Sequence, residues 1–113
     1  MKKLYYIEQV VFLRDLVEAV CKQSADYECY TTDDGQNSLY FFQDLAPDFI
    51  LVDWATIASY ESDLLKELNE IPDTLVGLTF ENEGEIPPAW MERVSLKLEK
   101  PLEAKTLLKK IFS

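Results

Sequence analysis

Histidine is absent from this chain of 113 residues, and cysteine occurs only twice, as Cys21 and Cys29. Without histidine, the chain cannot form Ser-His or Cys-His nucleophiles, histidine metal sites or a histidine pH switch. Two cysteines are too few for a disulfide scaffold, and we expect both to be reduced thiols buried in the core. The sequence therefore excludes several common kinds of enzyme site.

Positive charge is also scarce, because 11 basic residues face 21 acidic ones and the net charge is -10. Such a chain repels phosphate backbones and anionic lipids, so we expect neither nucleic acid nor membrane as a partner. No apolar run approaches the roughly 20 residues of a membrane span. The apolar run that begins at Leu4 is interrupted by Glu8, which argues against a signal peptide and for a cytoplasmic protein.

The residues that are present have a globular composition, with 48% hydrophobic and 28% charged residues. We expect a single domain over residues 1–113. Five short apolar runs predict strands, and helical spacing of apolar residues predicts helices between them. The predicted strands are Leu4–Ile7, Tyr27–Thr31, Phe49–Asp53, Leu75–Thr79 and Val94–Leu98. The predicted helices are Val10–Lys22, Gly35–Leu45, Ser62–Leu68 and Pro101–Phe112, with a short one around Trp90 and Met91 after the two prolines at 87 and 88.

Strands that alternate with helices predict a parallel sheet with helices on both faces. The continuous apolar run Phe49–Val52 fits a strand that is covered on both sides. In such sheets the functional site lies at the carboxyl ends of the strands. The polar residues predicted at those ends are Glu8, Gln9, Asp53, Thr79 and Lys100.

Five segments, in this order, resemble the receiver domain of bacterial response regulators, the CheY-like family. They are Lys2–Glu8, Asp34–Leu39, Pro47–Asp53, Leu78–Thr79 and Lys100–Leu102. The resemblance covers nearly the whole chain. It implies a doubly wound five-stranded parallel sheet of order 2-1-3-4-5, with a shortened fourth helix.

The resemblance also implies roles for the residues at the strand ends. Asp53 would be the phosphoryl acceptor, while Thr79 and Lys100 would bind phosphoryl oxygens. Mg²⁺ would be held by Glu8, Asp53 and the Ala55 backbone carbonyl, with Gln9 as a weak ligand. Carboxylate and carbonyl oxygens are the ligands that Mg²⁺ prefers.

Three features depart from the family pattern. Gln9 stands where a second carboxylate is usual, so Mg²⁺ should bind weakly. Phe80 follows Thr79 where a small residue is usual, and its ring is expected to cover the site. The loop after Asp53 lacks the usual proline and glycine.

The leading interpretation is a stand-alone receiver-like signalling domain of the two-component phosphorelay type, with phosphorylation of Asp53 gating a protein–protein contact. It would not be an enzyme beyond self-phosphorylation and autodephosphorylation. Its partners would be a histidine kinase or phosphotransfer protein and a downstream protein. A homodimer would form through the face of Trp90, Lys97 and Leu102.

Two other interpretations stay open. In the first, the chain is a pseudo-receiver that acts as a phosphorylation-independent protein-interaction module, as Gln9 and Phe80 suggest. In the second, it is a small α/β enzyme such as a flavodoxin-like carrier. The second ranks low because residues 8–11 (Glu-Gln-Val-Val) contain no glycine or hydroxyl for a phosphate-binding loop.

Overall fold

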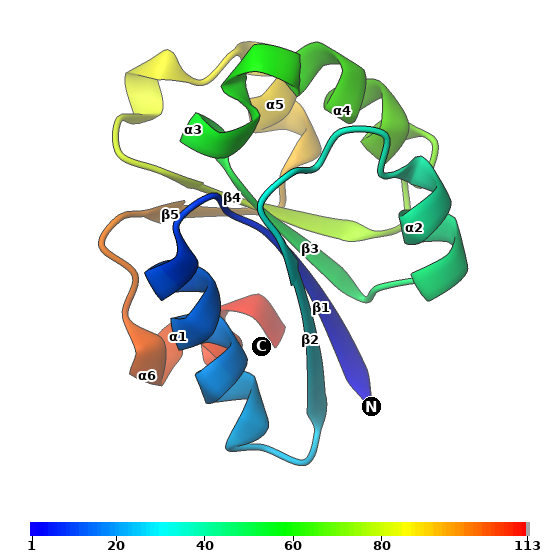
Figure 1. The fold of residues 1–113 in the computed structure, drawn as a ribbon. Helices are drawn as coiled ribbons and strands as arrows, with labels where there is room; N and C mark the ends of the chain where they lie inside the picture. Colours follow the sequence, from blue (N-terminus) through cyan, green and yellow to red (C-terminus); the bar gives the residue numbers. More distant parts are fainter. Residues whose placement is uncertain (113) are drawn as a thin grey trace.

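All five strands are parallel and lie side by side in the order β2-β1-β3-β4-β5 (Figure 1). This structure is a computed structural model that describes residues 1–112, so Ser113, the last residue of the predicted domain, lies outside it. The strands are β1 (Lys2–Ile7), β2 (Tyr27–Thr32), β3 (Phe49–Asp53), β4 (Leu75–Phe80) and β5 (Leu96–Glu99). The fold class and the strand order predicted from the sequence are thereby confirmed.

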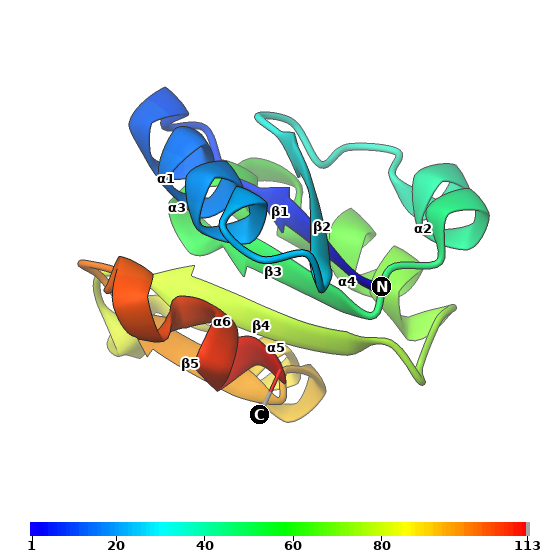
Figure 2. The same cartoon turned by 90° about the horizontal axis from the view of Figure 1, so that it is seen from below.

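Helices cover both faces of the sheet (Figures 1 and 2). One face packs against α1 (Val11–Lys22) and α6 (Ala104–Phe112). The other packs against α2 (Leu39–Leu45), α3 (Trp54–Ile57), α4 (Glu61–Asn69) and α5 (Pro88–Arg93). Two short 3-10 segments, η1 (Ala58–Tyr60) and η2 (Glu83–Glu85), complete the chain. No helix among the residues 1–112 is long and apolar enough to cross a membrane.

The central strand β3 is buried at every position, as its continuous apolar sequence predicted. Side chains alternate along a strand, so Ile50 and Val52 join the core under α2 to α5. Phe49 and Leu51 join the core under α1 and α6. Burial of Cys21 in the second core is confirmed, whereas Cys29 on β2 is only half-buried.

Several predicted boundaries are wrong, because local hydrogen bonds override apolar spacing. The second helix begins at Leu39 rather than Gly35, since the preceding loop forms turns and places Asn37 in the left-handed region at φ 56°. The fifth strand begins at Leu96 rather than Val94, because the Val94 N–H donates to Trp90 O and ends α5. The last helix begins at Ala104 rather than Pro101, three residues later than the apolar spacing predicted.

The predicted dimer face needs a correction at Trp90. The expected short fourth helix is present as α5, but Trp90 is 0% exposed and its indole faces the core. Its ring contacts that of Trp54 edge to face, and its Nε1 donates to Glu61 Oε2 at 2.6 Å. Trp90 therefore cannot take part in a dimer contact, whereas Lys97 is exposed and Leu102 half-buried.

Candidate functional site

Four polar residues meet at the carboxyl edge of the sheet. Glu8 follows β1, and Asp53 is the last residue of β3. Thr79 lies on β4 directly opposite Asp53, and Lys100 follows β5. Glu8 and Thr79 are 0% exposed and Asp53 is 1% exposed. Parallel strands bring their carboxyl ends to one edge, which explains why residues so distant in sequence come together.

Lys100 joins the two carboxyl groups. Its Nζ lies 2.7 Å from Glu8 Oε1 and 2.8 Å from Asp53 Oδ1. Only 15% of the Lys100 side chain is exposed, so both ion pairs are shielded from solvent. The ammonium therefore connects the ends of β1, β3 and β5.

Thr56 on α3 belongs to the same site, although sequence reasoning missed it. Its hydroxyl donates to Asp53 Oδ2 at 2.7 Å, and its backbone N–H donates to the same oxygen at 3.1 Å. The hydroxyl also accepts the Gln9 N–H at 2.9 Å. The available signal was an aspartate placed three residues before a threonine at the start of a helix, which is the spacing of an N-cap.

Every carboxylate oxygen of the site accepts at least one hydrogen bond, and each oxygen of Asp53 accepts two. Asp53 Oδ1 accepts from Lys100 and from Thr79, whose hydroxyl lies at 3.0 Å, while Asp53 Oδ2 accepts both donors of Thr56. Glu8 Oε1 accepts from Lys100 and from the Tyr6 hydroxyl at 3.1 Å. Glu8 Oε2 lies within reach of the backbone N–H of Val10, at 3.3 Å, and of the Thr56 hydroxyl, at 3.2 Å.

The site shifts the pKa values of its own groups. Burial by itself would raise the pKa of Asp53, but the hydrogen bonds from Lys100, Thr56 and Thr79 outweigh burial and lower it. Burial would lower the pKa of Lys100, but its bonds to Asp53 and Glu8 raise it. Burial, reinforced by the neighbouring Glu8, raises the pKa of Tyr6. Asp53 and Lys100 thus stabilise each other's charged forms.

These shifts predict how stability depends on pH. The pKa of Asp53 is below its usual 3.8 in the folded chain, so its contribution is present above pH 3.8 and is lost as the pH falls through the lower, folded value. The pKa of Lys100 is above its usual 10.5, so its contribution is present below pH 10.5 and is lost at higher pH. Unfolding free energies measured from pH 2 to 7 should fall less steeply in acid for Asp53→Asn than for the unchanged chain. Identical acid slopes would contradict this prediction.

The donor set does not fit Mg²⁺ as it is arranged. Of the residues that the structure describes, only two place a carboxylate in the site, and all four of their oxygens already accept hydrogen bonds. Gln9 is exposed, and its backbone is engaged by Thr56 and Arg14. Ala55 lies exposed in the first turn of α3. Within residues 1–112, no cluster of three or more acidic or cysteine ligands is suited to hold a metal ion.

Comparisons with known proteins identify the fold. Neither the comparison with protein-family models nor that with curated proteins gave a match. The receiver domain of the TMAO respiratory system response regulator TorR is similar in structure, with a TM-score of 0.79 at 18% identity over 96% of this chain and 92% of that one. A response regulator from Thermotoga maritima gives a TM-score of 0.76 at 16% identity, over 96% and 92%. The chemotaxis protein CheY4 from Vibrio cholerae gives 0.74 at 23% identity, over 96% and 94%. This chain therefore has the fold of the response-regulator receiver domain, as its sequence segments suggested.

Proposed function

We propose that this chain is a receiver-fold signalling protein that acts as a phosphorylation-independent protein-interaction module. The observation that carries the proposal is the occupancy of Asp53. Both of its carboxylate oxygens accept two hydrogen bonds, and the side chain is sealed from solvent. These features are those of a structural aspartate rather than of a nucleophile.

A phosphoryl acceptor needs an oxygen that can approach the donor in line. Here the Thr56 hydroxyl and N–H cover Oδ2, and Lys100 and Thr79 cover Oδ1. A hydrogen bond to a charged group contributes about 1.5–3 kcal/mol, so freeing one oxygen would cost at least that for each bond broken. Access to the acceptor is therefore opposed on both sides.

A gated receiver is the second candidate, in which Asp53 accepts a phosphoryl group from a histidine kinase or phosphotransfer protein. The observation that favours it is the meeting of Asp53, Thr79 and Lys100, the three residue types that such a switch uses. This role would require Mg²⁺ at Glu8, Asp53 and the Ala55 carbonyl. It would also require Thr56 to leave Oδ2.

The two candidates predict different masses after treatment with acetyl phosphate and Mg²⁺. For the interaction module, we expect the intact mass of the chain to stay unchanged, because no oxygen of Asp53 is free to attack. Intact-mass spectrometry, run on the unchanged chain and on Asp53→Ala in parallel, measures this directly. A gain of one phosphoryl group that Asp53→Ala abolishes would overturn the proposal.

Tryptophan fluorescence provides a second readout, because Trp54 directly follows Asp53. We expect no saturable change when Mg²⁺ is added at millimolar concentration, since both carboxylates are already engaged. Quenching that saturates in the unchanged chain, and that disappears in Asp53→Ala, would support the gated receiver instead.

A further inference from the structure

Two large aromatic side chains lie exposed on α2, in addition to the site described above. Tyr40 is 73% and Phe41 58% exposed, whereas the adjacent Phe42 is buried against Tyr5. The two exposed rings meet edge to face, with centroids 6.2 Å apart. Asp44 follows one turn later and is exposed on the same side of the helix. The outer face of α2 is therefore aromatic and acidic.

A small cavity lies between α4 and the loop that leads into α2. It has a volume of about 40 Å³ and is lined by the loop before α2 and by Tyr60, Asp63, Leu64 and Glu67. One water-sized group needs roughly 10–15 Å³, so this cavity has room for the charged end of a long side chain. Glu67 Oε2 is buried and accepts no hydrogen bond from any residue between 1 and 112. A buried acceptor without a donor is costly, and an incoming N–H would relieve that cost.

The long stretch of chain that includes α2 carries only acidic charged side chains. No lysine or arginine lies between Lys22 and Lys66, whereas nine aspartate and glutamate residues do. Among residues 1–112, Asp53 is the only one of those nine that forms a salt bridge. The nearby exceptions are Lys66 on α4 and Lys3, whose Nζ bonds the Leu45 carbonyl at the far end of α2.

We propose that α2 and this cavity form a docking surface for a cationic, partly apolar segment of a partner protein. An arginine or lysine would enter the cavity and donate to Glu67, and apolar side chains would cover Tyr40 and Phe41. A guanidinium or ammonium also binds favourably to the faces of exposed aromatic rings. Phosphate-bearing partners are disfavoured by the same acidic field.

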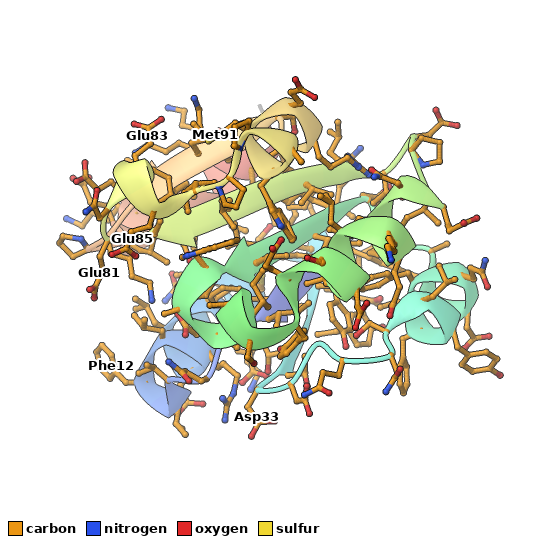
Figure 3. All side chains as sticks on the ribbon, turned by 90° about the horizontal axis from the view of Figure 1, so that it is seen from above. Phe12, Asp33, Glu81, Glu83, Glu85 and Met91 are labelled. Atoms are coloured by element: carbon orange, nitrogen blue, oxygen red, sulfur yellow. The ribbon has the colours of Figure 1, made fainter. Side chains whose placement is uncertain are left out.

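A second exposed apolar surface, around Phe12 at the start of α1, fits this occupant less well. Phe12 is 71% exposed and borders a groove, but Lys100 lines that groove together with Glu81. Figure 3 shows Phe12 on the side of the molecule away from α2, the side that also carries the acidic residues Glu81, Glu83 and Glu85. This surface therefore supplies a matched control that is both aromatic and acidic.

The test uses an isotope-labelled full chain and a short synthetic peptide of arginine and leucine, followed by NMR. We expect saturable binding that weakens with added salt and shifts the signals of residues 35–45 and 60–68. Tyr40→Ser and Glu67→Gln should each weaken binding about tenfold, as central contacts of an interface do. Phe12→Ser and Glu85→Gln should change it less than about twofold. A peptide with glutamate in place of arginine should not bind.

Three outcomes would overturn the docking surface. They are shifts that map around Phe12, equal weakening by Phe12→Ser and Tyr40→Ser, and no saturable binding. If sedimentation of the chain alone shows a dimer that Tyr40→Ser dissociates, the occupant is a second copy and the proposed partner is wrong. The variants alter exposed or cavity positions, so we expect their unfolding midpoints to be unchanged. Unchanged midpoints show that a variant binds less well although it is still folded.

This inference rests on the proposed function only in that the chain acts through protein contacts, and the two can fail separately. The titration is repeated after treatment with acetyl phosphate and Mg²⁺. Binding at α2 only after a treatment that phosphorylates Asp53 would overturn phosphorylation-independence and leave the docking surface standing. Absence of binding in both states, with no phosphoryl group gained, would overturn the docking surface and leave phosphorylation-independence standing.

Discussion

Replacing Lys100 with methionine is expected to lower the free energy of unfolding by about 3–5 kcal/mol, the usual result of leaving buried charge without its partner. The Lys100 ammonium is shared by Glu8 and Asp53, at 2.7 and 2.8 Å. Methionine retains an unbranched chain of similar length, so the apolar part of the contact is largely kept. Urea unfolding at neutral pH, followed by circular dichroism, measures the difference.

Lys97 provides the matched control for Lys100, because it is a lysine on β5, three residues before Lys100. Its ion pair with Glu83 is 3.4 Å long, and its side chain is 47% exposed. An exposed pair of this kind contributes only about 0–1 kcal/mol, so Lys97→Met should be nearly neutral. Equal losses of unfolding free energy for Lys97→Met and Lys100→Met would contradict the view that the buried ion pairs of Lys100 stabilise the fold.

Two further readouts separate the charge of Lys100 from its packing. Removing the ammonium removes a main cause of the low pKa of Asp53, so Lys100→Met should unfold at a higher pH in acid titrations than the unchanged chain. Asp53→Asn should recover part of the loss when it is combined with Lys100→Met, because fewer charges are then left buried. Strict additivity of the two substitutions would indicate that the two groups do not interact.

The meeting of Glu8, Asp53, Thr79 and Lys100 could be predicted because it follows from topology. Once alternating strands and helices indicate a parallel sheet, the residues at strand ends must share one edge. The continuous apolar run Phe49–Val52 also indicated a strand that is covered on both sides, which is what the structure shows for β3.

Thr56 and Gln9 show what apolar periodicity could not indicate. The role of Thr56 depends on a single helical turn after Asp53, which is too short to have a periodic pattern. The Gln9 N–H donates to the Thr56 hydroxyl, and its carbonyl accepts from Arg14. Its position is therefore set by backbone contacts that residue identity does not reveal. These contacts, rather than the identities of the acidic residues, decide whether Asp53 is free to react.

Replacing Trp90 with alanine should be the other severely destabilising change, with an expected loss of about 3–5 kcal/mol. The indole is fully buried in the core beneath α2 to α5, and its ring centroid lies 6.0 Å from that of Trp54. Alanine would leave a cavity and remove the donor of Glu61. Circular dichroism is the suitable probe. Trp54 and Trp90 are the only tryptophans, so replacing Trp90 would itself change the fluorescence.

Trp90→Phe separates the indole hydrogen bond from the volume of the ring. Phenylalanine fills most of the space but leaves Glu61 Oε2 without the donor that lies at 2.6 Å, so an intermediate loss of about 1–3 kcal/mol is expected. Tyr40→Ala on α2 is the exposed aromatic control and should cost less than about 0.5 kcal/mol. If Trp90→Ala proved as mild as Tyr40→Ala, α5 would not be packed as described, and Trp90 would again be available to a partner. A large loss of unfolding free energy for Trp90→Ala, with a negligible loss for Tyr40→Ala, would place Trp90 in the core and leave Tyr40 free for binding.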